Sequence, residues 1–150
     1  LRIWLRSAKG KGYLETLRMT EISLPITTLL GSCLLALLLV LSWHVIKGRQ
    51  SGGVSIGDGD DKSLERRIRA QANLTEYAPL FVILIALLEM QGGNPLILGL
   101  LSAAFVIGRL AHGYALAFTT GNVAGRLGGM VLTLGSSGLA VIYGIVVAIS

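Results

Sequence analysis

The feature that most constrains the fold of this chain is a set of four long apolar blocks that contain few charged residues. The hydrocarbon core of a bilayer is about 30 Å thick, and a helix of about 20 mostly apolar residues crosses it. Hydrophobic residues make up 53% of the chain and charged residues 14%, and the charges lie at or between the blocks. The sequence therefore predicts an all-α, multi-pass integral membrane protein built as a four-helix bundle.

The predicted spans cover residues 24–46, 66–90, 95–118 and 125–149 of a single membrane domain, residues 19–150. Residues 1–18 are basic and weakly patterned, and we expect a leader extension that is not part of the native domain, with an amphipathic surface helix as the alternative. Residues 47–63 are rich in Gly, Asp and Ser and predict a long loop. The Asp residues in this loop lack the closing Glu of a calcium-binding EF-hand loop, so we interpret them as a solvated turn.

The distribution of Lys and Arg predicts the orientation in the membrane. The first loop and the start of the second span are basic, the second loop has no Lys or Arg, and the third connection ends at Arg126. We therefore expect the first and third loops in the cytoplasm and the second loop outside. Because the basic residues lie at membrane surfaces, the net charge of +5 does not indicate a nucleic-acid partner.

The second span begins with a polar face that enters an apolar segment. At about 100° per residue, Arg66, Arg69, Asn73 and Glu76 share one narrow side of the helix. Snorkelling to the membrane surface explains arginines near a span end, but it does not explain shorter polar side chains one and two turns deeper. Polar groups at such a depth are costly unless they have partners. This face is therefore a candidate functional site.

Other segments bring polar residues to the same cytoplasmic side. Arg49 follows the first span, Arg109 and His112 lie in the third, and Arg126 begins the fourth. We expect Glu76 to be the counter-ion of Arg109, within one protomer or across its interface with a neighbour, because a lone arginine in hydrocarbon is costly. His112 either donates a hydrogen bond into the site or only partners Arg109. Arg126 also lies where the free N–H groups of a helix start add positive charge.

The chemistry of this cluster suits a small anion that carries an amine. Guanidinium groups bind carboxylates, a carboxylate accepts from an ammonium group, and an amide side chain binds main-chain amides. Glutathione fits this inventory, and other anionic metabolites fit it as well. No zinc-type Cys/His spacing, P-loop or dinucleotide glycine motif occurs, so the residues predict no metal site.

The fourth span is rich in small residues, which allow helix backbones to approach closely in lipid. Gly125 and Gly129 stand four residues apart, as do Ser136, Ala140 and Gly144. This spacing predicts a packed helix face.

The run LERRIRAQANLTEYAP at residues 64–79 resembles the signature of the MAPEG family, the membrane-associated proteins in eicosanoid and glutathione metabolism. The resemblance extends to GRLAH at residues 108–112. It implies a four-helix protomer, a homotrimer, and glutathione as co-substrate bound between protomers beside membrane lipid. Carried over by position, it implies that glutathione contacts Arg49, Arg69, Gln71, Asn73, Glu76 and Tyr77, and that Arg126 faces the glutathione sulfur.

This chain departs from eicosanoid-producing members of the family at one position. They carry a tyrosine one turn after the position of His112, where this chain has Leu116, and Tyr114 projects to nearly the opposite side. The expected function is a glutathione-dependent transferase or peroxidase that acts on a lipophilic substrate. The alternatives are a non-catalytic membrane protein that conducts ions or protons through Glu76, Arg109 and His112, and a purely structural membrane protein.

Overall fold

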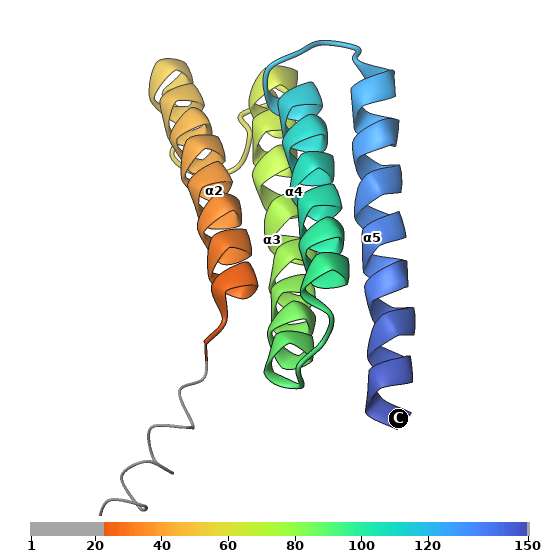
Figure 1. Ribbon diagram of the computed structural model, residues 1–150. Helices are drawn as coiled ribbons and strands as arrows, with labels where there is room; N and C mark the ends of the chain where they lie inside the picture. Colours follow the sequence, from red (N-terminus) through yellow and green to blue (C-terminus); the bar gives the residue numbers. More distant parts are fainter. Residues whose placement is uncertain (1–22, 150) are drawn as a thin grey trace, which may run out of the picture.

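The computed structural model describes residues 23–149, and within them it contains four helices and no strand. All four helices are long and apolar enough to cross a membrane. They lie side by side, with α2 and α5 on opposite sides of the α3–α4 pair (Figure 1). The helices are α2 (Pro25–Gly52), α3 (Lys62–Met90), α4 (Pro95–Ala117) and α5 (Val123–Ile149). The predicted all-α four-helix membrane bundle is confirmed, and the prediction for residues 1–18 lies outside the described residues.

The first helix is longer than its apolar composition predicts. It continues through part of the expected loop to Gly52 and ends at Gly53, whose φ of 64° reverses the chain. The continuation packs closely on α3, because a Cβ atom at Gly48 would lie 3.0 Å from the Leu64 side chain and 2.9 Å from that of Arg67. Tertiary packing therefore keeps a polar, glycine-containing segment helical.

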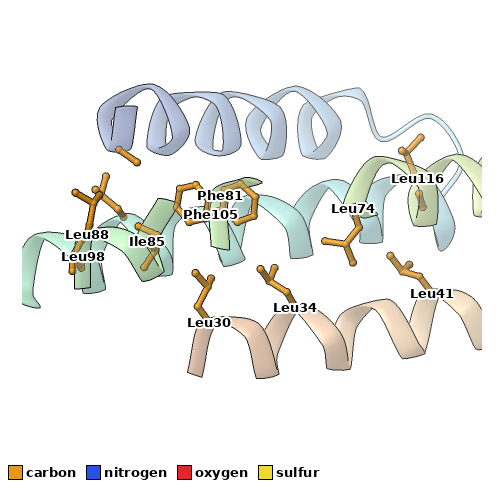
Figure 2. Packing of buried hydrophobic residues seen from close by; sticks show 13 residues of the cluster. Leu30, Leu34, Leu41, Leu74, Phe81, Ile85, Leu88, Leu98, Phe105 and Leu116 are labelled. Carbon is orange, nitrogen blue, oxygen red and sulfur yellow. The ribbon is translucent and has the colours of Figure 1, made fainter. Parts of the chain in front are cut away.

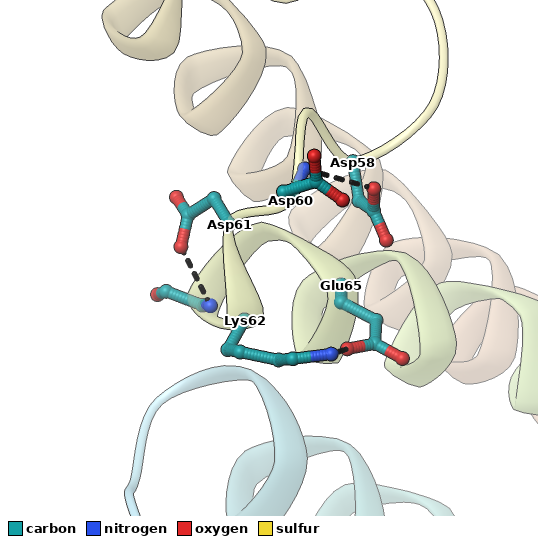
Figure 3. Close-up of polar contacts among 6 residues, drawn as sticks. Asp58, Asp60, Asp61, Lys62 and Glu65 are labelled. Atoms are coloured by element: carbon teal, nitrogen blue, oxygen red, sulfur yellow. Dashed lines mark hydrogen bonds and ion pairs between the residues drawn. The ribbon is translucent and has the colours of Figure 1, made fainter.

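The first loop, residues 53–61, ends in an acidic turn that starts α3 (Figure 3). Asp61 accepts a hydrogen bond from the Ser63 N–H at 2.7 Å and so caps the helix, while Asp58 accepts from the Asp60 N–H at 3.2 Å. Because an N-cap residue satisfies a free N–H at the helix start, α3 begins at Lys62 rather than near residue 66. The acidic residues form the solvated turn that the sequence predicts.

The interior is filled by large apolar side chains from α2, α3 and α4 (Figure 2). Phe81 and Phe105 stack near the middle of the bundle, with ring centroids 3.9 Å apart and planes 6° from parallel. The buried residues of α5 are small by comparison: Gly129, Thr133, Ser136 and Ala140. Apolar side chains on the outside of the bundle remain exposed, as expected for membrane helices that contact lipid.

The closest helix contact joins α4 to α5 through glycines. A Cβ atom at Gly129 would lie 2.6 Å from the His112 nitrogen, and one at Gly108 would lie 2.8 Å from the Gly129 carbonyl oxygen. Gly125 is also close, because its Cβ would lie 3.0 Å from that of Ala115. The small-residue face predicted for the fourth span is therefore confirmed, and it packs within the chain, with Gly125 and Gly129 against α4 and Gly144 against α3.

At the end of the bundle where α2 begins and α3 ends, the Glu89 side chain binds the first turn of α2. Its carboxylate accepts hydrogen bonds from the N–H groups of Ile26 and Thr27, at 2.9 and 2.8 Å, and from the Thr27 hydroxyl at 2.7 Å. The first N–H groups of a helix lack partners within it, and a carboxylate there is also stabilised by the helix dipole. This contact, which the sequence did not reveal, ties α2 to the end of α3.

The order of the helices makes the predicted orientation testable. The first and third loops lie at one end of the bundle and the second at the other (Figure 1). In a variant with Cys33 replaced by Ala, we expect Gln91→Cys to react with a membrane-impermeant maleimide in intact cells, and Ser55→Cys to react only in inverted vesicles. Both positions are exposed, and they avoid Gly59 and Gly92, whose positive φ would strain a cysteine. Labelling of both cysteines from the same face would contradict the predicted topology.

Candidate functional site

A polar hollow of about 650 Å³ opens between α3, α4 and α5 near the first and third loops. Three arginines, two glutamates, an asparagine, a tyrosine and a histidine supply its polar lining, and apolar side chains form the rest. Its lining residues are Glu65, Arg66, Arg69, Asn73, Glu76, Tyr77, His112, Leu116, Val123, Arg126, Leu127 and Met130. The lining therefore carries both charge signs beside an apolar wall, which suits a dipolar ligand.

The α3 contribution is the face that helical periodicity predicts. Arg66, Arg69, Asn73 and Glu76 all line the hollow, so the prediction that they share one side of the helix is confirmed. Arg69 and Glu76 form an ion pair at 4.0 Å, with side chains 57% and 52% exposed. Because an exposed ion pair contributes only about 0–1 kcal/mol, both groups can exchange it for a bound ligand at little cost.

The side of the hollow opposite α3 is held in place by main-chain hydrogen bonds. His112 is buried, and its Nδ1 lies 3.2 Å from the carbonyl oxygen of Arg126. Arg126 lies in the first turn of α5 with an exposed side chain that lines the hollow. The side-chain oxygen of Asn122 accepts a hydrogen bond from the Gly125 N–H at 2.9 Å, and the main-chain carbonyl of Asn122 accepts one from the Arg126 N–H at 3.3 Å.

These contacts correct part of the expectation for Arg126. The Val123 N–H also has a partner, the Gly121 carbonyl oxygen at 2.8 Å, so most of the first N–H groups of α5 are already satisfied within the chain. The prediction that free N–H groups would point at the site is wrong for these residues. The positive charge that this turn offers a ligand is therefore mainly the Arg126 guanidinium.

Arg109 lies beneath the hollow and joins three helices. Its Nε donates to the Thr133 hydroxyl at 2.9 Å, its Nη1 to the Asn73 carbonyl oxygen at 3.3 Å and its Nη2 to the Met130 sulfur at 3.6 Å. The guanidinium also lies 5.3 Å from the centre of the Tyr77 ring. These contacts satisfy a buried cation by hydrogen bonds and a ring face rather than by a carboxylate.

The predicted pairing of Arg109 with Glu76 is therefore wrong within the chain. Among residues 23–149, Glu76 pairs with Arg69, whereas the buried Arg109 faces α5 and the α3 backbone. The interpretation of His112 as merely a partner for Arg109 also fails, because the ring binds the main chain of Arg126. His112 does line the hollow, as the other interpretation predicts.

These partners define a double-mutant test of stability. We expect Arg109→Leu and Thr133→Val to couple by about 0.5–3 kcal/mol in the free energy of unfolding, because they share a buried hydrogen bond. Arg109→Leu and Glu76→Gln share none, and their effects should add to within about 0.5 kcal/mol. Denaturant unfolding in mixed micelles measures all the variants. Stronger coupling for the Glu76 pair than for the Thr133 pair would contradict the observed contacts.

Two predicted site residues lie on the α2 side of the chain, away from the hollow. Gln71 donates from Nε2 to the Ser42 hydroxyl at 2.9 Å, and Arg49 donates from Nη1 to the Ser55 carbonyl oxygen at 3.0 Å. Neither lines the hollow. Their contact with glutathione stays a prediction that requires a second copy of the chain.

The α5 part of the apolar wall, Val123, Leu127 and Met130, was missed by the sequence reasoning. Leu116 ends up inside the hollow, whereas Tyr114 is 59% exposed on the outside, as their spacing along the helix predicts. Leu127 directly follows Arg126 and Met130 comes one turn after it, so helical spacing alone was sufficient to place them near it. Glu65 precedes Arg69 by four residues, and the same spacing applies to it.

Comparison with known proteins agrees with the membrane fold. The chain is similar to the inner membrane protein YecN of Escherichia coli (strain K12), with 32% identity over 78 residues, and the protein of that name from Escherichia coli O6:H1 matches to the same extent. The match spans 52% of this chain and 60% of the relative. No solved structure matches. The model of the MAPEG family matches residues 27–146, most of the chain. This chain therefore belongs to the MAPEG family.

Proposed function

We propose that this protein is a glutathione-dependent transferase or peroxidase of the membrane. The hollow between α3, α4 and α5 would bind glutathione and present its sulfur, as a thiolate, to a lipophilic electrophile or peroxide. The observation that carries the proposal is the convergence of Arg69, Asn73, Glu76 and Arg126 on one hollow.

The charges of the hollow match those of glutathione. Arg66 and Arg69 offer guanidinium groups for carboxylates, and Glu76 offers an acceptor for an ammonium group. The Asn73 side-chain amide offers both a donor and an acceptor to a peptide group. The main-chain carbonyl of Asn73 accepts a hydrogen bond from Arg109. A ligand with two carboxylates, one amine and two amides therefore finds a partner of suitable charge for each of its polar groups.

Arg126 is the residue that we assign to the sulfur. It stands across the hollow from the α3 face, on α5, where the adjacent Leu127 and, one turn on, Met130 add apolar side chains to the lining. A guanidinium group favours the thiolate over the thiol, and the thiolate is the nucleophile. A cation beside an apolar wall suits a step in which sulfur attacks a lipophilic molecule.

The second substrate would arrive from the bilayer. Val123 and Leu127 line the hollow and are also 57% and 62% exposed, so the apolar wall continues onto the lipid-facing surface of α5. Leu116 lines the hollow at the position where eicosanoid-producing members of the family carry a tyrosine and its hydroxyl group. The wall therefore supports an apolar co-substrate and offers no side-chain hydroxyl at that position.

We further propose a homotrimer in which a neighbouring copy completes the site. The Arg69–Glu76 pair is about half exposed, so the hollow of one chain leaves much of its bound ligand uncovered. Arg49 lies at the end of α2, on the opposite side of the bundle from α5. The α2 surface of a second copy, placed against the hollow, would bring this arginine to the ligand and cover the charged groups.

The rival function, an ion or proton path, relies on contact between Glu76, Arg109 and His112. In residues 23–149 these side chains bond to other groups: Glu76 to Arg69, Arg109 to α5 and the Asn73 carbonyl, and His112 to the Arg126 carbonyl. A binding site for a dipolar ligand explains the arrangement better than a relay of these residues.

The proposed activity is tested with purified protein in detergent. We expect glutathione to be consumed when an aromatic electrophile or an organic hydroperoxide is added. Asn73→Leu should raise the glutathione KM, while Gln91→Ala, an exposed change in the second loop at the other end of the bundle, should leave it unchanged. Failure of both substrate classes, together with no measurable glutathione binding by calorimetry, would overturn the proposed function.

A further inference from the structure

The chain has two histidines, and the ring of each has one nitrogen facing a backbone carbonyl. The His112 Nδ1 lies 3.2 Å from the Arg126 carbonyl oxygen, and the His44 Nε2 lies 3.1 Å from the Ala117 carbonyl oxygen. A carbonyl oxygen only accepts hydrogen bonds, so the nitrogen that faces it must carry the hydrogen. The neutral histidines are therefore in opposite tautomers, with hydrogen on Nδ1 of His112 and on Nε2 of His44.

His112 lies at the closest contact between α4 and α5. Its backbone nitrogen and Cβ would lie only 2.6 and 2.9 Å from a Cβ atom at Gly129, so α5 packs directly on this residue. The residue is 8% exposed, and its Nε2 has no hydrogen-bond partner in residues 23–149. One nitrogen thus binds the first turn of α5 while the other is an acceptor without a partner beside the hollow.

We propose that His112 is a positioning residue for Arg126. The Nδ1–H group holds the Arg126 carbonyl and so sets where the first turn of α5 stands relative to α4. Asn122 caps that turn from within the connection, so in residues 23–149 the His112 ring supplies the side-chain hydrogen bond that links α4 to the start of α5. Without the His112 hydrogen bond, the first turn of α5, and the Arg126 side chain that it carries, would be less restrained relative to the hollow. The inference rests on the proposed function, because it deepens the role of Arg126 toward the sulfur.

Two near-isosteric substitutions separate the two ring nitrogens. The amide nitrogen of asparagine falls near the position of Nδ1, so His112→Asn keeps the donor to the Arg126 carbonyl. The longer glutamine places its amide near Nε2, so His112→Gln loses that donor while it keeps a polar group at the other position. A purely structural role predicts similar behaviour of the two variants, whereas a positioning role through Nδ1 predicts different behaviour.

The first measurement uses the wild-type protein without ligand. In protein labelled with ¹⁵N-histidine, at a pH well above the ordinary histidine pKa of about 6.5, nitrogen shifts report which ring nitrogen carries hydrogen. We expect one residue in each tautomer, and His44→Gln should remove the Nε2–H signal. A His112 with hydrogen on Nε2 would overturn the inference without bearing on glutathione binding.

The second measurement compares the thiolate fraction of bound glutathione in the variants. Loss of one neutral hydrogen bond changes an equilibrium by about three- to tenfold. We expect His112→Asn to keep the wild-type thiolate fraction and His112→Gln to lower the ionisation constant of the bound thiol by that factor. Equal fractions in both variants would overturn the positioning role. Absence of glutathione binding by the wild type would instead overturn the proposed function, and the tautomer result would still stand.

Discussion

Replacing Arg126 by leucine is expected to lower turnover by about 10²–10³-fold, the usual loss when a group that stabilises developing negative charge is removed. A free thiol of pKa about 8.5 is only a few per cent ionised at pH 7, so the enzyme must favour the thiolate. Arg126 is exposed at the hollow and is not engaged in an ion pair among residues 23–149. Glutathione should remain bound through Arg69, Asn73 and Glu76, so that kcat falls far more than the affinity for glutathione.

A matched pair of variants distinguishes activation from simple anchoring at the membrane surface. Arg126→Lys keeps the positive charge and should retain more turnover than Arg126→Leu. Arg66→Leu removes another arginine of the same hollow and should weaken glutathione binding without a comparable loss of thiolate. If Arg126 is only an anchor, Arg126→Leu should reduce expression or stability and leave the thiolate fraction unchanged. Unchanged thiolate and turnover in that variant would end the proposal for Arg126.

Replacing Gly129 by alanine is expected to destabilise the protein by about 1–3 kcal/mol or more, the usual cost of overpacking a close contact. The added methyl group would lie 2.6 Å from the His112 nitrogen and 2.7 Å from the Gly108 carbonyl oxygen, which are backbone atoms that cannot swing aside. Either α5 moves away from α4 or the contact breaks. Because His112 borders the hollow, we also expect weaker glutathione binding. Thermal unfolding and calorimetry of the purified variant measure the two effects.

The neighbouring glycines of the same helix provide the control. A Cβ atom at Gly128 or Gly135 would have no neighbour within 4 Å. Alanine has the higher helix propensity by about 1 kcal/mol, so Gly128→Ala and Gly135→Ala should leave stability unchanged or raise it slightly. Destabilisation by all three changes alike would mean that the packing of α5 on α4 is not the cause, and would point to contacts with a second copy.

The four membrane spans and the polar face of α3 could be predicted from the sequence because both depend on local rules. A long apolar block predicts a spanning helix, and helical spacing places Arg69, Asn73 and Glu76 on one side whatever the helix packs against. The end of α2 was predicted too early because Gly48 is held by contacts with α3, which no local pattern reveals. Helix boundaries are decided by such tertiary contacts.

The partners of the buried charges were the least predictable part. Charge complementarity favoured Glu76 for Arg109, but the structure satisfies Arg109 with a hydroxyl, a carbonyl and a sulfur atom. Depth along a helix says nothing of which way a long side chain turns. Glu89 was missed for a related reason, since its partners are backbone N–H groups of α2 and no side-chain pattern marks them.

The central claim is that the hollow binds glutathione as a thiolate, and one titration tests it directly. Purified protein in detergent at neutral pH is titrated with glutathione while the ultraviolet absorbance of the thiolate is recorded. We predict a saturable thiolate signal that S-methylglutathione, which has no thiol hydrogen to lose, displaces without producing a signal of its own. Absorbance no greater than that of the same glutathione free in buffer, at concentrations where calorimetry shows the hollow occupied, would contradict the claim.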